Sequence, residues 1–197
     1  NGAERLKIKR VTNLGTVGWT RLNNAFLGCT NLTEFTSGST DTSAVTDTGR
    51  MFLYCSGLTS LDVSSFDTSA ALTMIAMFWG CSGLTSIDVS SFNTSSCTTM
   101  QYMFNVCPGL TSIVGVEDWD ITGLNSTVSL ASFLNAGKMT TPQYDNLLVK
   151  WEAQASVIPA MTAYFGTSTY TGGSAAATAH ASLTDVYGWS IGDGGIA

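Results

Sequence analysis

The residues best suited to chemistry are hydroxyl and carboxylate side chains that recur between leucines. Residues 58–66 read Leu-Thr-Ser-Leu-Asp-Val-Ser-Ser-Phe, and residues 84–92 repeat this run with one Ile for Leu. Because side chains alternate along a strand, we expect the polar residues of both runs on one open face. There they could hydrogen-bond a sugar or a protein edge. The candidate ligand-binding residues are Thr59, Ser60, Asp62, Ser64, Thr85, Ser86, Asp88 and Ser90.

A structural interpretation of the same residues stays open. They could merely solvate the sheet, with the aspartates also bonding turn amides. Stacking predicts that Asp62 lies about 5 Å from Asp88, a distance at which two carboxylates repel. Hydroxyls, a cation or a ligand would have to offset that repulsion.

Groups for catalysis are scarce. His180 is the only histidine and lies in an Ala-rich stretch, and a triad built on it would need an activated Ser and an orienting acid. No cysteine or histidine pair has the spacing of metal ligands. Asp193, in the turn sequence Gly-Asp-Gly-Gly, offers calcium one carboxylate, whereas calcium takes several oxygens. We therefore predict a protein that is not an enzyme, with no catalytic residues, no metal and no cofactor.

A phenylalanine and a cysteine that return together every 26 residues indicate how the chain is organised. A fixed step predicts one unit stacked without insertion, which is a solenoid. Equivalent residues then lie about 5 Å apart, so we expect a buried ladder of thiols. Cys97 falls outside this register and is the one candidate for a reactive or pairing thiol. The pairs are Phe26 and Cys29, Phe52 and Cys55, Phe78 and Cys81, and Phe104 and Cys107.

Each unit predicts a strand followed by a short helix. The apolar positions of residues 58–66 fit the leucine-rich-repeat template, whose middle forms a short strand. In residues 74–81 and 100–107, two Met, one Phe and one Cys fall on one helical stripe, and Thr68 and Thr94 are placed to cap these helices. The predicted fold class is therefore an α/β solenoid of leucine-rich repeats, with a short parallel strand and a short helix in each 26-residue unit.

The C-terminal part predicts a different, capping arrangement. A helix begins at Thr141 and Pro142, and an extended stretch covers Met161 to Tyr170. Ser174 is placed to cap a second helix, with Ala179, Leu183 and Val186 on one face, before a last short strand at 189–191. Such a small α/β module would cover the open end of a solenoid. The predicted domains are an N-terminal basic segment and cap at 1–24, four to five leucine-rich repeats at 25–137, and a helix-strand-helix-strand cap at 138–197.

The distribution of charge excludes several partners. Only 11% of residues are charged, five of the eight basic residues lie in the first 21 positions, and there is no Lys or Arg from Met51 to Gly137. A groove for nucleic acid needs rows of basic side chains, and a membrane span needs about 18 consecutive apolar residues. We therefore expect neither nucleic-acid binding nor membrane insertion. A surface rich in hydroxyls and poor in charge is common outside cells.

The repeat resembles a known family. The run Met-Phe-x-x-Cys-Ser-Gly-Leu-Thr-Ser-Leu-Asp-Val-Ser-Ser-Phe-Asp-Thr-Ser, at 51–69 and with two substitutions at 77–95, resembles the BspA-like leucine-rich-repeat surface proteins of bacteria and phages. The resemblance covers about residues 25–137, and the C-terminal run is similar to the ending of many such proteins. It implies display on a surface and adhesion to host matrix, cells or glycans, and short versions occur among phage structural proteins.

The functional prediction is a non-enzymatic adhesion module, displayed on a surface, that recognises a glycan or protein through a concave strand face. The alternative is a structural component of a phage or extracellular assembly, such as a fibre, a capsid decoration or a filament subunit. The expected location is extracellular, at the cell surface or in a virion. Under the second hypothesis the partners include copies of the chain itself.

Overall fold

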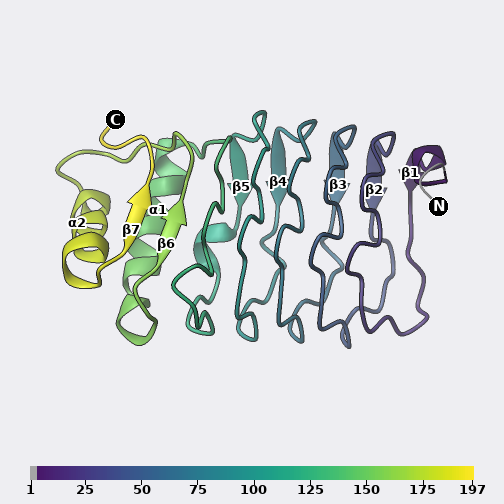
Figure 1. Ribbon diagram of the computed structural model, residues 1–197, viewed down its shortest axis with the longest axis horizontal. Coiled ribbons are helices and arrows are strands. Elements are labelled where there is room, and N and C mark those ends of the chain that lie inside the picture. The colour runs from purple at the N-terminus through teal and green to yellow at the C-terminus, as the bar shows by residue number, and fades with distance from the viewer. Residues whose placement is uncertain (1–3) are drawn as a thin grey trace.

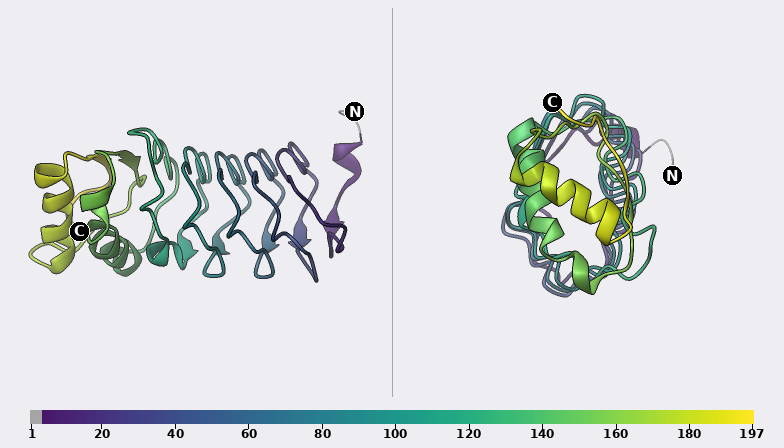
Figure 2. Two further views of the ribbon diagram at one scale, coloured as in Figure 1. Left: turned by 90° about the horizontal axis from the view of Figure 1, so that it is seen from below. Right: turned by 90° about the vertical axis from the view of Figure 1, so that its left-hand side faces the viewer.

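The computed structural model describes residues 4–197, so the first three residues of the predicted N-terminal segment lie outside the described part. Figure 1 shows an elongated molecule in which successive turns of the chain, called coils here, lie side by side along the longest axis. The N-terminal end and α2 are at opposite ends. Figure 2 shows a nearly straight stack from a second direction, so we refer to its strand face without calling it concave.

Short parallel strands run along one side of the stack. Paired strands are offset by 26 residues, as in Glu34 opposite Ser60 and Ser86 opposite Ser112. The middle residues Phe35, Ile87 and Ile113 are buried, because alternate side chains of a strand point to opposite faces. The strands are β1 (Arg10–Val11), β2 (Glu34–Thr36), β3 (Ser60–Asp62), β4 (Ser86–Asp88), β5 (Ser112–Val114), β6 (Thr162–Tyr164) and β7 (Ser190–Gly192).

A column of phenylalanines forms the centre of the stack. The rings of Phe26, Phe52, Phe78 and Phe104 are nearly parallel, with neighbouring centroids 5.4–5.7 Å apart and interplanar angles of 8–10°. The cysteines beside them are buried. The thiols of Cys55, Cys81 and Cys107 donate to the carbonyls of Phe26, Phe52 and Phe78 at 3.0, 3.2 and 3.1 Å.

The short helices predicted for the repeats are wrong. Residues 74–81 form consecutive turns. Met77 N donates to Met74 O within its coil, whereas Phe78 N donates to Met103 O of the next coil at 2.9 Å. N–H groups thus alternate between bonds within a coil and bonds to the next one. We call this arrangement, which recurs at residues 22–29, 48–55 and 100–107, the turn ladder.

Left-handed backbone conformations explain why no helix forms. Each turn segment has two residues of positive φ four positions apart, such as Ala76 (55°) and Gly80 (75°), or Tyr102 (60°) and Val106 (55°). These conformations interrupt a right-handed helix. A helix of eight residues is marginal by itself, whereas the turn ladder gives every second N–H a carbonyl partner in the next coil.

Thr68 and Thr94 bind neighbouring coils instead of capping helices. Both side chains are buried. Thr68 Oγ1 donates to Asn93 O at 2.8 Å, and Thr94 Oγ1 donates to Asp120 O at 2.9 Å. The strands, the turn ladder and these threonines therefore join the coils on three sides.

The regular column ends after Phe104. Phe133 follows it by 29 residues, and its ring meets that of Phe104 edge-on at 5.3 Å and 82°. The backbone nevertheless stays paired, since Phe104 N donates to Phe133 O at 2.8 Å. Before this point the chain makes the 3-10 helix η2 (Val116–Asp118), and Trp119 stacks on Phe92.

Two helices cover the C-terminal end of the stack, as Figure 2 shows in its end-on view. Ser174 caps α2 by accepting hydrogen bonds from Ala176 N and Ala177 N, as predicted. The residue before α1 is Thr140, whose side chain makes no capping bond. Val186, predicted on the buried face, is 73% exposed, because α2 passes into a π-helical turn that shifts the facing residues. The helices are α1 (Thr141–Glu152), α2 (Ala175–Ala181), the π-helical turn η4 (Ser182–Val186), and the 3-10 helices η1 (Arg5–Lys7) and η3 (Ala155–Val157).

Replacing Val106 with Gly should stabilise the protein. Val106 has positive φ in the coil position that Gly28 and Gly80 occupy. A left-handed conformation costs a residue with a Cβ roughly 1–2 kcal/mol, and the extra freedom of Gly in the unfolded chain offsets roughly 0.5–1 kcal/mol of that gain. Urea unfolding should therefore show a free energy of unfolding higher by about 0.5–1 kcal/mol. Val106→Ala keeps the Cβ and is the control without this gain; a loss of stability in Val106→Gly would restore the helix interpretation.

Candidate binding groove on the strand face

All eight predicted binding residues are exposed on the strand face. They do not form one continuous array. Asp62, Ser64, Asp88 and Ser90 line a single groove, whereas the two threonines and the serines at 60 and 86 lie outside it. Thr59 Oγ1 donates to Thr33 O at 3.2 Å, so this hydroxyl belongs to the bonding between coils.

The groove opens because β3 and β4 are not paired. The strands form one sheet of β1, β2 and β3 and a separate sheet of β4 and β5, and Figure 1 shows β3 and β4 further apart than their neighbours. At the equivalent steps, Thr59 N donates to Thr33 O and Thr111 N donates to Thr85 O. Within residues 4–197, no backbone bond from Thr85 to Thr59 completes this series. The expectation that Asp62 lies directly opposite Asp88 in one ladder is therefore wrong: Asp62 pairs with Thr36, and Asp88 with Val114.

The groove has an apolar floor and an acidic, hydroxyl-bearing rim. Its volume is about 280 Å³. Leu61 is half-buried here, whereas the equivalent Ile87 is buried, so the separation of the strands uncovers part of an apolar side chain. Besides the predicted residues, the lining includes Leu61, Val63 and Ser91. The sequence carries no signal for them, because residues 58–66 and 84–92 are almost identical.

Hydrogen bonds hold both carboxylates of the groove in place. Asp62 Oδ1 accepts from Ser64 N at 3.0 Å and from Ser64 Oγ at 2.6 Å. Asp88 Oδ1 accepts from Ser90 N at 2.9 Å and Ser90 Oγ at 2.6 Å. The bond from the serine side chain, followed by the backbone bond, lowers the pKa of each aspartate. Both groups are therefore ionised at neutral pH, and their second oxygens receive no bond from residues 4–197.

The charge of the whole protein is concentrated around this groove. Residues 51–137 contain six acidic residues and no basic one, whereas the rest of the chain contains eight of each. The formal charge of −6 thus arises entirely in this segment. No Lys or Arg side chain of the segment can neutralise Asp62 or Asp88.

A second row of aspartates lies one corner further along each coil. Asp67 Oδ1 accepts from Ser69 N at 2.9 Å, and the same turn recurs at Asp41, Asn93 and Asp120. The Asp-Thr-Ser run, which repeats in the sequence, is the signal for this row. Its regular serine or threonine partner indicates a structural role in turning the chain.

The cysteines are structural rather than reactive. Cys97 is buried, and its thiol donates to Thr99 O at 3.3 Å. Burial raises the pKa of Cys97 to about 11 and that of Cys55 to about 12. A thiol is nucleophilic only as the thiolate, so neither residue is suited to chemistry at neutral pH.

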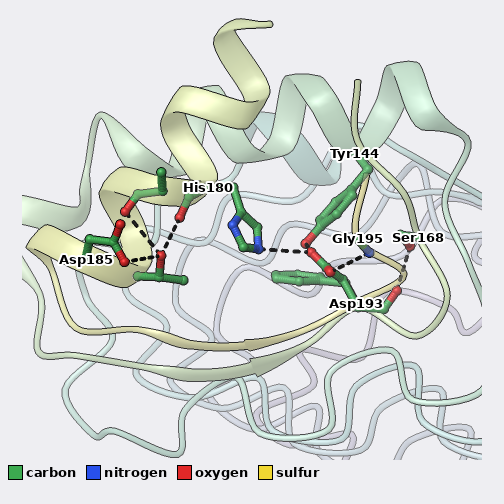
Figure 3. Close-up of polar contacts among 9 residues, drawn as sticks. Tyr144, Ser168, His180, Asp185, Asp193 and Gly195 are labelled. Carbon is green, nitrogen blue, oxygen red and sulfur yellow. Dashed lines mark hydrogen bonds and ion pairs between the residues drawn. The ribbon is translucent and has the colours of Figure 1, made fainter. Parts of the chain in front are cut away.

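His180 belongs to a structural cluster in the cap, shown in Figure 3. Its Nε2 lies 3.3 Å from Asp193 Oδ2, and its ring stacks on Tyr170 at 4.6 Å. Tyr144 OH donates to the same Asp193 oxygen at 2.6 Å, and Gly195 N donates to Oδ1 at 2.8 Å. Burial, followed by the bond to Asp193, raises the pKa of Tyr144. The carboxylate therefore joins α1, α2 and the C-terminal tail, and no serine nucleophile takes part.

Two further features of the described residues bear on chemistry and location. Within residues 4–197, no group of three or more His, Cys, Asp or Glu side chains is arranged to hold a metal ion. Among the helices of the same residues, none is both long and apolar enough to cross a membrane.

The buried thiols predict a loss of stability at alkaline pH. Their pKa values in the folded state, about 11 for Cys97 and Cys107 and about 12 for Cys55, exceed the ordinary value of 9.0. A raised acid pKa favours folding below the unfolded pKa, and this contribution disappears as the pH rises through the folded values. Urea midpoints should be constant up to about pH 8 and fall between about pH 9 and 12. At pH 8 the native protein should not react with a thiol reagent, and rapid modification of Cys97 without unfolding would contradict this account.

Comparison with known proteins identifies a family. The sequence profile described as "Mycoplasma protein of unknown function, DUF285" matches residues 20–147, about two thirds of the chain. No curated protein matches the chain, and no solved structure matches it. The matched region includes all the coils with a turn ladder, the groove and the first half of α1. The chain therefore belongs to the DUF285 family.

Proposed function

We propose that this protein is a non-enzymatic binding module whose strand face recognises a glycan or a protein at the groove between β3 and β4. The observation that carries the proposal is the separation of two strands that their near-identical sequences would otherwise pair. It creates a groove of about 280 Å³ with an apolar floor at Leu61 and ionised carboxylates at its rim. Grooves that combine apolar surface with a few fixed polar groups are typical ligand sites.

The chemistry of the rim suits a partner with hydroxyl, amide or cationic donors. Asp62 and Asp88 are acceptors at neutral pH, while Ser91 adds a hydroxyl. The hydrogen bonds from Ser64 and Ser90 fix the carboxylates before binding, which lowers the entropy lost when a ligand is bound. The excess of negative charge in residues 51–137 disfavours anionic partners.

Surface display and adhesion are part of the same proposal. The repeated run at 51–69 and 77–95 resembles BspA-like leucine-rich-repeat surface proteins, and the parallel strands at 26-residue steps are compatible with a leucine-rich-repeat solenoid. We therefore propose an extracellular, cell-surface or virion location, with the strand face directed toward the target.

Removing the two carboxylates should abolish binding without unfolding the protein. The double variant Asp62→Asn and Asp88→Asn keeps an oxygen that can accept from Ser64 and Ser90 but removes both charges. We expect at least tenfold weaker binding, since bonds to charged groups contribute about 1.5–3 kcal/mol each. Binding would be measured on a glycan array and on immobilised extracellular-matrix proteins.

Asp67→Asn is the matched control for this experiment. Asp67 makes the same turn with Ser69 and is equally exposed, but it does not line the groove. It should bind as the unaltered protein does. Equal binding by the double variant, or equal losses in both variants, would overturn the proposal.

A structural role in an assembly is the alternative, and one feature of the N-terminal end favours it. In later coils the carbonyls of Met51 and Leu53 accept from Phe26 N and Gly28 N. The equivalent carbonyls of the first coil, Ala25 and Leu27, receive no hydrogen bond from residues 4–197. This edge could accept a neighbouring chain, whereas α1 and α2 cover the other end. An assembly built on this edge therefore joins two molecules and does not continue into a filament.

Sedimentation velocity at high protein concentration separates the two functions. The binding proposal predicts a monomer, because the groove is complete within one chain. A concentration-dependent dimer would favour the structural alternative, and loss of that dimer after charge reversal at Arg5 and Lys7, which lie beside the open edge, would locate the contact there.

A further inference from the structure

A small polar hollow lies half a coil away from the strands, where the turn ladder begins. Its volume is about 170 Å³. Ligand sites for drug-sized molecules measure roughly 300–1,000 Å³, so this hollow has room for a single ring rather than a peptide. The side chains around it are Asn23, Asn24, Asp47, Arg50, Thr73 and Ile75.

A missing side chain creates the hollow. Gly49 occupies the coil position that Asn23 has in the previous coil and Ile75 in the next. A Cβ at Gly49 would lie 3.0 Å from Asp47 Oδ1 and 3.4 Å from Ile75 O. The φ of Gly49 is not in the left-handed region, so backbone conformation alone does not require glycine here. Glycine thus leaves space at a position that other coils fill.

The polar groups around the hollow are available to a ligand. Asn23, Asn24 and Arg50 are exposed, and their side chains make no hydrogen bond or ion pair with residues 4–197. Asp47 is held in place because its Oδ1 accepts from Gly49 N at 2.9 Å. Thr73 pairs with Asp47 through a backbone bridge, which fixes the spacing of the two coils at this point.

These groups match vicinal hydroxyls better than any charged ligand. The two amides can each donate and accept, the guanidinium donates, and the carboxylate accepts. Asp47 disfavours an anion and Arg50 disfavours a cation, so the site favours a neutral molecule. Ile75 adds a patch of apolar surface against which the C–H face of a ring could pack.

Exposed aromatic side chains continue from the hollow along the turn ladder. Tyr54 lies four residues after Arg50, and its ring centroid is 5.9 Å from that of Trp79. Trp79 in turn stacks on Tyr102 at 5.3 Å. Tyr and Trp rings combine apolar faces with polar tips, which suits the further units of an oligosaccharide.

We propose that this hollow is a second ligand site, which binds a neutral sugar in its pyranose form. The first ring lies between Asn24, Arg50 and Asp47, with its hydroxyls bonded to their side chains. The site does not depend on the groove between β3 and β4, so each can be tested while the other remains intact.

Saturation-transfer NMR with glucose, galactose, mannose and N-acetylglucosamine at millimolar concentration tests the proposal. We expect at least one of these sugars to receive saturation from the protein. Asn24→Gly and Arg50→Gly remove two of the polar groups at positions of positive φ, 59° and 56°, where glycine is well tolerated. Each should weaken binding about tenfold, as expected for the loss of a hydrogen bond in a bound complex.

Two further variants make the test specific. Gly49→Ala narrows the hollow and should also weaken binding, although it removes no polar group. Asp88→Asn alters only the groove on the strand face and should bind these sugars normally. The absence of saturation transfer to all four sugars would overturn the proposal, as would binding that is unchanged in Asn24→Gly, Arg50→Gly and Gly49→Ala.

Discussion

The hydrogen bonds between coils are the interaction on which the rest of this structure depends. In the turn ladder, every second N–H leaves its own coil and donates to the next, as Phe52 N does to Met77 O and Phe78 N to Met103 O. A buried backbone group without a partner costs about as much as a lost hydrogen bond, so each coil requires its neighbour. The parallel stacking of phenylalanines and the buried thiols follow, because the ladder sets one spacing for all equivalent residues.

Attachment on three sides also allows one side to open. Between the coils that carry β3 and β4, the turn ladder is intact, and Thr68 Oγ1 still donates to Asn93 O. The strands can therefore separate without detaching the coils. The separation exposes part of Leu61 and places Asp62 and Asp88 on one groove. The regular array thus supplies the scaffold, and a local departure from regularity supplies the candidate site.

The sequence alone predicts which residues are buried better than it predicts the backbone that buries them. The 26-residue step places Phe78 and Cys81 in the core, and Ser174 at the start of α2. The same spacing misidentified the turn ladder as a helix, because alternating turns bury residues 74, 77, 78 and 81 just as a helix would. Glycines at 28 and 80, which recur at a left-handed position, were the available clue. The exposure of all eight polar candidates follows from strand alternation. Their division by the gap does not, because the two runs differ by one methyl position at Leu61 and Ile87.

Amide hydrogen exchange tests the central claim most directly. Ser37 N donates to Asp62 O and Val89 N donates to Val114 O, each at 2.9 Å, whereas no equivalent bond links Val63 N to Asp88 O within residues 4–197. The account predicts slow exchange at Phe52, Tyr54, Ser37, Val89 and Thr111, and faster exchange at Val63 and Thr85. Equal protection of Thr85 and Thr111, and of Val63 and Val89, would show that β3 and β4 are paired in solution and would contradict the groove.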